Sequence, residues 1–468
     1  MKDGHVTGGD ITGSSERGEG VHISGDSTLK NVSVAGKSTS GSGVLLNGNV
    51  TLDESTVNQM RGHSESGTGI TLTNAIIHAK DGTAPATLSG VSQSGVGVGV
   101  SGTSSLDGVK LQGDSGDGGY GVSVSGHLKF DGPEAGINIH TSGQGSGLLL
   151  KDAVLTSGST DVKTPTKLLV ESNNGPAIVM EGDTTLTNVQ LDGKSLQNGA
   201  GIVLKDGHVT GGDITGSSDS GEGVRFSGDS TLKDVSVAGH TATGTGVNVH
   251  GDLTSADGTE IHGTATGDGT GMSLGPDITV TDSKLYGESR SGAGVKVESR
   301  TRLRRTLING KSAGGSGAVV NGEVSSDAGS AIAGNSGTGA GVLLNGSLTG
   351  GALTGHSGSG AGMLVTGNSQ ISGVNVNASS EGGTPLQVNG ELSTTGGSLN
   401  GQGLDNSSEK RQQVYEVQNR LSQNGHSLKQ VLISSGYREQ GTPVKVEICT
   451  DGQCRSLDAG MKDKPSRP

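Results

Sequence analysis

The chain has 468 residues, of which 89 are glycine, 29% are hydrophobic and 1% are aromatic, and tryptophan is absent. This composition excludes a thick globular core, while the regular spacing of Val, Ile and Leu argues against a disordered chain. The formal net charge of −13 disfavours nucleic acid as a partner, because phosphate binding needs a basic face. No apolar run approaches the roughly 18 residues of a membrane-spanning helix, so we expect no transmembrane segment.

A glycine phrase recurs along most of the chain. It reads Gly-x-Gly and then alternates apolar and polar residues up to a further glycine, as in residues 18–25, 41–48 and 339–346. A repeat of fixed period in this size range is typical of solenoids, in which each repeat packs on its neighbours. Counting near copies, the first glycine of the phrase falls at sixteen positions about 24 residues apart, namely 18, 41, 67, 95, 119, 145, 175, 199, 221, 244, 269, 292, 315, 339, 360 and 383.

Each repeat contains three short stretches in which apolar residues alternate with polar ones. Such alternation with glycine or Asx punctuation indicates strands joined by turns. We expect the glycines to lie at corners, where a positive φ favours them. The sequence therefore predicts a right-handed parallel β-helix of about sixteen coils over residues 1–403. The inward positions of the first full repeat are Val21, Ile23, Leu29, Val32 and Val34.

The start of the chain matches the middle of a later repeat. Residues 2–36 recur as 205–239, and the second copy is entered through a complete glycine phrase at 199–204. In the first copy Met1 takes the place of Leu204, so the first coil is predicted to be truncated. We interpret the chain as a fragment of a longer protein whose missing part carries the export signal and a cap; a native cytoplasmic start is the alternative. The five differences are Glu16/Asp219, Arg17/Ser220, His22/Arg225, Ile23/Phe226 and Asn31/Asp234.

The C-terminal part of the chain has a different composition. Over residues 404–460 glycine thins out and helix formers appear, which predicts a small α+β segment. One helix is expected to follow a capping box at 406–409, and a second to begin near Ser427 and end before Gly436. This segment is interpreted as a cap over the last coil, or as a small interaction domain. Residues 461–468 form a charged tail that we expect to be disordered.

The only two cysteines flank a predicted hairpin turn. Cys449 ends an alternating strand and Cys454 begins the return strand. This spacing suits a disulfide across the hairpin if the protein is exported, and two free thiols are the alternative. A metal site is not expected, because only His426 lies near these two sulfurs in the sequence.

A cluster of arginines is the most distinctive local departure from the repeat. Alignment on the coil turns Leu303 inward, so the arginines should face outward. In a chain of negative net charge they predict a basic patch for an anionic ligand, such as a sulfated or sialylated glycan or lipopolysaccharide phosphate. The alternative is a solvated outward face without a ligand. The members of the cluster are Arg300, Arg302, Arg304 and Arg305.

No constellation of catalytic or metal-binding residues stands out. The acids lie mostly in turns beside glycine, where Asp is favoured for backbone reasons, and few aromatic residues are present to stack on a sugar. The Gly-Gly-Asp at 8–10 is not repeated in tandem, as a calcium-binding nonapeptide array would require. We therefore predict no enzyme activity, no catalytic residues, no cofactor and no metal. Representative turn acids are Asp10, Asp26, Asp213 and Asp229.

Four features of about residues 1–403 are shared with a known class of proteins. They are the Gly-x-Gly-Val coils, the Asn/Asp-Gly turns, the richness in Ser and Thr and the absence of Trp. They resemble the passenger and exoprotein regions of Gram-negative surface adhesins, namely diffuse-adherence-type autotransporters and two-partner-secreted filamentous haemagglutinins. The resemblance implies a cell-surface or secreted protein, associated with the outer membrane, that mediates attachment, autoaggregation or biofilm formation. No C-terminal membrane anchor of the autotransporter kind is recognisable, which favours a two-partner exoprotein or a fragment.

The resemblance also implies partners. These are glycans or proteins on host or bacterial cells, further copies of the chain, and a separate outer-membrane transporter. Two alternatives remain open. One is a β-helical protein that binds or degrades polysaccharide, such as a lyase or a phage tailspike, which aspartates and arginines meeting in one groove would favour. The other is a non-functional remnant of a truncated adhesin.

Overall fold

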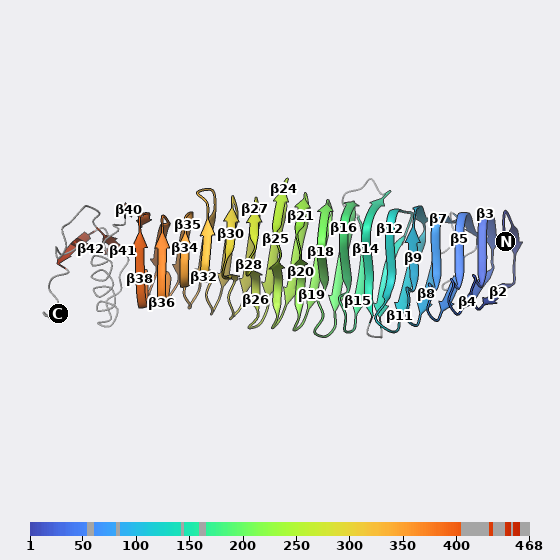
Figure 1. Cartoon of the computed structure of the whole chain (residues 1–468), viewed down its shortest axis with the longest axis horizontal. Coiled ribbons are helices and arrows are strands. Elements are labelled where there is room, and N and C mark those ends of the chain that lie inside the picture. The colour runs from blue at the N-terminus through green and yellow to red at the C-terminus, as the bar shows by residue number, and fades with distance from the viewer. Residues whose placement is uncertain are drawn as a thin grey trace. The chain divides into compact units, whose positions relative to one another are not determined.

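The computed structural model describes residues 1–53, 60–80, 85–141, 145–158, 165–403, 430–433, 445–450 and 453–458. Within these ranges the chain forms an all-β parallel solenoid of about 16 turns without a helix, so the predicted fold class is confirmed (Figure 1). The residues group into two compact units, Met1–His240 with Ala256–Thr259 and Thr241–Ser255 with Glu260–Pro468.

In the first unit, successive turns pair in register as two parallel sheets. Residues Val21–Lys30, for example, pair with Val44–Asp53 over their full length. The first sheet contains β1 (His5–Thr7), β3 (Val21–Lys30), β5 (Val44–Asp53), β7 (Ile70–Ala79), β9 (Val98–Ser101), β10 (Thr103–Asp107), β12 (Tyr120–Asp131), β14 (Ser146–Ser157), β16 (Ile178–Thr187), β18 (Ile202–Thr210), β20 (Glu222–Ser227) and β21 (Ser230–Lys233). The second contains β2 (Asp10–Ser15), β4 (Ser33–Ser38), β6 (Met60–Ser64), β8 (Ala86–Ser92), β11 (Val109–Ser115), β13 (Gly136–Thr141), β15 (Thr166–Ser172), β17 (Val189–Ser195), β19 (Asp213–Ser218) and β22 (Ser236–Thr241).

The second unit repeats the arrangement. Its first set of strands comprises β23 (Thr245–His250), β24 (Leu253–Ala256), β26 (Thr270–Leu274), β27 (Thr279–Thr281), β29 (Val295–Val297), β30 (Thr301–Arg304), β32 (Ala318–Ser326), β34 (Val342–Thr349), β36 (Met363–Ser372) and β38 (Leu386–Thr395). Its second set comprises β25 (Glu260–Ala265), β28 (Lys284–Ser289), β31 (Leu307–Ser312), β33 (Ala331–Ser336), β35 (Ala352–Ser357), β37 (Asn375–Ser380), β39 (Ser398–Leu399) and β40 (Gln402–Gly403).

Residues of positive φ occupy both predicted corners of the first full repeat. Gly25, in the middle of β3, has φ 71°, and Asn31, just after β3, has φ 52°. Glycine and Asx residues adopt this left-handed conformation at the least cost. The duplicated block keeps both corners at Gly228 (φ 73°) and Asp234 (φ 55°), so the Asn-to-Asp change preserves the backbone.

The core is a column of aliphatic side chains, as the alternation predicts. All five inward residues of the first full repeat are buried, and Phe226 is fully buried where the first copy has Ile23. Burial of one such side chain contributes about 1.5–3 kcal/mol. Each turn contributes only a few, so the stability of a unit builds up from turn to turn.

The glycines of the Gly-x-Gly phrase are not explained by positive φ, and the expectation that they mark left-handed corners is wrong. Neither Gly18 nor Gly20 has a positive φ. A Cβ on Gly20 would instead lie 2.5 Å from the backbone nitrogen of Lys37, and a Cβ on Gly13 would lie 1.9 Å from the carbonyl oxygen of Gly20. The backbones of the two sheets therefore meet directly at this edge of the turn, and a side chain has no room there.

A column of buried hydroxyl groups, which the sequence pattern did not reveal, lies beside these glycines. The Ser38 hydroxyl donates to the carbonyl oxygen of Gly18 one turn earlier (2.7 Å) and accepts from the backbone N–H of Gly41 (2.9 Å). Both bonds satisfy groups that burial would otherwise leave unpaired. The same pair of bonds recurs in both units at Ser64, Ser92, Ser289, Ser312, Ser336, Ser357 and Ser380.

Three antiparallel strands are described in the C-terminal segment: β41 (Gln430–Ile433), β42 (Lys445–Thr450) and β43 (Gln453–Asp458). The backbone register of β42 and β43 places Cys449 opposite Cys454, and the disulfide remains a prediction. β41 lies where the second helix was expected. The reason is that Val431 and Ile433 are β-branched and the segment pairs with β42. The first expected helix, the start of the second and the tail 461–468 lie outside the described residues.

Candidate functional site

The predicted arginine cluster centres on β30 in the second unit. Leu303 is buried, as expected from the coil alignment, whereas Arg302 and Arg304 on either side of it are exposed. Arg300 and Arg305 flank the strand at two corners, with φ of 58° and 45°. A positive φ is uncommon for arginine, so these two residues occupy positions that glycine or Asx residues hold in other turns.

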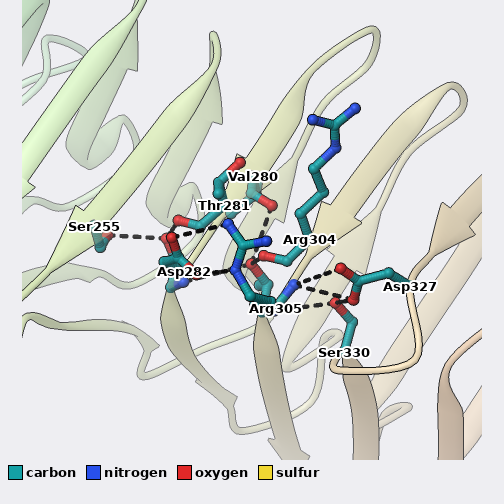
Figure 2. Close-up of polar contacts among 10 residues, drawn as sticks. Ser255, Val280, Thr281, Asp282, Arg304, Arg305, Asp327 and Ser330 are labelled. Carbon is teal, nitrogen blue, oxygen red and sulfur yellow. Dashed lines mark hydrogen bonds and ion pairs between the residues drawn. The ribbon is translucent and has the colours of Figure 1, made fainter.

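Both corner arginines form ion pairs with the corner aspartates of the preceding turn. Arg300 bonds Asp277 through two nitrogens, with Nη2 2.9 Å from Oδ2 and Nε on Oδ1. Arg305 bonds Asp282 in the same way, with Nε 2.6 Å from Oδ1 and Nη2 3.2 Å from Oδ2 (Figure 2). Such bidentate pairs have the strongest geometry available to an arginine and a carboxylate.

These contacts set the charge state of the cluster. Hydrogen bonds from Arg300 hold the pKa of the Asp277 carboxyl below its ordinary value, and those from Arg305 do the same for the pKa of Asp282. The pKa of Asp327 is also lowered, first by the Ser330 hydroxyl and then by the Arg305 backbone N–H. Two of the four predicted basic groups are therefore neutralised by carboxylates.

The other two arginines are differently placed. Arg302 Nε lies 3.3 Å from the Thr279 hydroxyl. In the part of the chain that the structure describes, the Arg304 side chain has no hydrogen-bond or ion-pair partner, and its guanidinium extends away from Asp282 and Asp327 (Figure 2). An anionic ligand would meet these two groups rather than all four, and the predicted patch stays a prediction.

A cavity of about 510 Å³ lies beside this cluster. Two carboxylates and two guanidinium groups line it, from Asp277, Glu323, Arg300 and Arg302. No aromatic residue of the described ranges lines the cavity, so a sugar ring would find no stacking surface among them. Asp277 is held by Arg300, whereas the Glu323 carboxylate forms no ion pair with the residues that the structure describes.

The turn acids accept hydrogen bonds from the backbone or from amide side chains; the Asp26 carboxylate accepts from Asn49 (2.8 Å) and that of Asp213 from Gln190 (3.2 Å). The Asp3 carboxylate accepts from the N–H of Asp26 (2.9 Å), and in the duplicated block Asp206 accepts from the N–H of Asp229 (3.0 Å). Asp10 and Asp213 begin β2 and β19. Among the described residues, no group of three or more His, Cys, Asp or Glu side chains is arranged to hold a metal ion.

The register brings together three basic residues that sequence reasoning missed. Lys37 on β4 lies beside His63 on β6, and Arg61 lies two residues before His63 on the same face. The signal was present, since Lys37 and His63 take the same outward position in consecutive repeats, each four residues before the first glycine of a phrase. The alternation alone did not show that these side chains lie together over exposed backbone.

No protein-family model matches the chain, and no curated protein matches it at a significant level. In the described residues, no helix has the length and apolarity needed to cross a membrane.

Proposed function

We propose that the chain is the binding region of a bacterial surface adhesin, which displays outward side chains on a repetitive scaffold and performs no catalysis. One observation carries the proposal. In the second sheet, the inward position stays glycine in consecutive turns, at Gly13, Gly36, Gly62 and Gly90. The outward position beside it changes every time, through Thr12, Ala35, Arg61 and Ser89.

A constant interior with a variable exterior suits recognition. The interior glycines are required by backbone contact, whereas an outward side chain can change without disturbing the next turn. Asp3 and Asp206 accept backbone hydrogen bonds and Asp282 pairs with Arg305, which are structural roles. The proposed partners are glycans or proteins on cell surfaces or further copies of the chain, and the proposed location is the cell surface, reached with a separate transporter.

The test is gain of adhesion. The full chain is displayed through a heterologous anchor on a bacterium that neither attaches nor aggregates, and attachment to epithelial cells and settling of the culture are measured. We expect an increase in at least one of them over cells that display the anchor alone at equal surface density. Equal attachment and equal settling in the two strains would contradict the proposal.

A second candidate, a polysaccharide-degrading enzyme, is favoured by the cavity beside β30. There Glu323 would remove the proton from the carbon next to a uronic carboxylate while Arg302 balances the charge of that carboxylate. The freed electron pair forms a C=C bond as the glycosidic C–O bond breaks, and the departing sugar oxygen takes a proton from water and leaves as a hydroxyl. Incubation of the full chain with a uronic-acid polysaccharide tests this by the ultraviolet absorbance of the new double bond, with Glu323→Gln as the control. No absorbance change with the unaltered chain counts against it.

A further inference from the structure

We propose that a hollow on the outer face of β2, β4, β6 and β8 in the first unit binds an acidic polysaccharide through Lys37, Arg61 and His63. This inference deepens the proposed adhesin function and rests on it. The hollow measures about 840 Å³ and is larger than the cavity beside β30. It lies wholly within one unit.

The backbone register fixes how the three basic residues are arranged. Lys37 pairs with His63 on the next strand, and the same row begins at Ser14 and ends at Val91. Neighbouring strands are about 4.8 Å apart, and outward residues on one strand repeat every ~6.6 Å. The three side chains therefore start from the corners of a small triangle that spans two strands, with Arg61 in the second row.

The charge of the hollow differs from that of the whole chain. Lysine and arginine side chains are positively charged at neutral pH, and the chain carries a net charge of −13. Among the described residues, no carboxylate lines the hollow. Lys37, Arg61 and His63 form no side-chain hydrogen bond or ion pair with other described residues, in contrast to Arg300 and Arg305. Their donors are available to a ligand.

The remaining lining favours a glycan. Hydroxyl groups of Thr12, Ser14 and Ser89 border the basic residues, and the floor is backbone of a glycine row. Val91, which is 42% exposed, offers an apolar contact for the C–H face of a sugar. Single-stranded nucleic acid relies on aromatic stacking, for which this surface offers only the imidazole. The three basic side chains are separated from one another over an exposed polar surface. This arrangement suits the regularly spaced sulfate or carboxylate groups of a sugar polymer.

The experiment measures binding of the purified full chain to immobilised heparin, with neutral dextran as the reference surface. The altered chain carries Lys37→Ser, Arg61→Ser and His63→Ser together, since serine already occupies outward positions of these rows at Ser14 and Ser89. We expect an affinity loss of about tenfold or more. The slope of log affinity against log salt concentration should flatten by about one for each fixed charge removed.

A matched control removes three cations that are already paired. Lys80, Lys129 and Lys233 form ion pairs with Asp53, Asp131 and Asp257, and their joint replacement by serine changes the net charge by a similar amount. We expect this control to keep its heparin affinity within about twofold. Equal losses in both altered chains, or no loss in either, would overturn the proposal. Circular dichroism and the urea midpoint establish that each altered chain is folded.

Competition identifies the occupant. Free heparin, polyglutamate and single-stranded DNA are compared, at equal charge concentration, as competitors for binding of the chain to immobilised heparin. If polyglutamate or single-stranded DNA competes more strongly than free heparin, the glycan assignment is overturned. A dimer of the full chain that the triple substitution abolishes would overturn it as well. Attachment of displayed cells separates the two proposals. If displayed cells adhere but the chain does not bind heparin, only the proposed polysaccharide site is refuted. If the chain binds heparin but displayed cells do not adhere, only the adhesin function is refuted.

Discussion

The hydroxyl oxygen of Ser38 lies 2.7 Å from the carbonyl oxygen of Gly18, which belongs to the preceding turn. The same hydroxyl accepts the N–H of Gly41 in its own turn, so one buried side chain connects two turns through two hydrogen bonds. Because Ser38 is only 4% exposed, water cannot replace these bonds. The solenoid is thus held at this edge by polar contacts as well as by its aliphatic column.

Loss of this hydroxyl should destabilise the first unit. Ser38→Ala removes the partner of two buried backbone groups, and we expect the free energy of unfolding to fall by about 1–3 kcal/mol. Urea denaturation followed by circular dichroism measures the change. Ser38→Thr is the matched control, because Thr241 occupies the same position and accepts from Gly244 at 2.9 Å. A full loss in the threonine variant would show that packing rather than hydrogen bonding matters.

A methyl group at the sheet contact should also be costly. In Gly20→Ala the new Cβ would meet the Lys37 backbone at 2.5 Å, and backbone cannot rotate away as a side chain can. We expect a loss of about 1–3 kcal/mol in the free energy of unfolding, measured in urea. Gly99→Ala is the control, since its nearest neighbour would be a side-chain atom at 3.3 Å. Equal stability of both variants would refute the role given to the Gly-x-Gly phrase.

The corner ion pairs predict a pH dependence. The folded-state pKa of Asp277 and of Asp282 lies below the ordinary value of 3.8, so their contribution is present above that value. It is lost as the pH falls through the lower folded-state pKa. The urea midpoint of the Asp277→Asn/Asp282→Asn chain should therefore lie below that of the unaltered chain at pH 6. The two midpoints should converge as the pH falls through the lowered folded-state pKa of these carboxyls. A gap between the two midpoints that does not narrow as the pH is lowered from 6 into the acid range would contradict the assignment.

The duplicated block offers a natural test of core volume. Phe226→Ala should cost about 3–5 kcal/mol, because the fully buried ring leaves a cavity. Phe226→Ile should cost much less, since the first copy carries Ile23 at the same inward position and buries it completely. Both changes are measured by urea denaturation. Comparable losses would mean that the two copies are packed differently.

The alternation of Val21, Ile23 and Leu29 was enough to predict the strands and their inward faces, because a period of two leaves one choice of buried face. It could not predict why Gly20 is glycine. That reason lies in the approach of Lys37 from another strand, and local pattern carries no information on distances between strands. The burial of Ser38 and its hydrogen bonds could not be predicted either, because a serine in a polar sequence gives no sign of burial.

In the arginine cluster, too, the repeat predicted which side chains face outward but not which residues they contact. The exposure of Arg302 and the burial of Leu303 followed from the repeat. The pairing of Arg305 with Asp282 did not, because it joins residues 23 apart that both occupy unusual left-handed corners. The basic hollow was not predicted, because the alternation shows which side chains face outward but not which of them lie together over exposed backbone.

The serine column also bears on how such a chain can change its length. Every turn that carries the column presents a glycine carbonyl to the next turn and a hydroxyl to the previous one, so these interfaces are chemically alike. If the turn between them were deleted whole, Ser64 would face the carbonyl of Gly18 just as Ser38 does now. Recombination between repeats can therefore remove or add complete turns without creating a mismatched joint, and selection can act on length separately from the identity of the exposed residues.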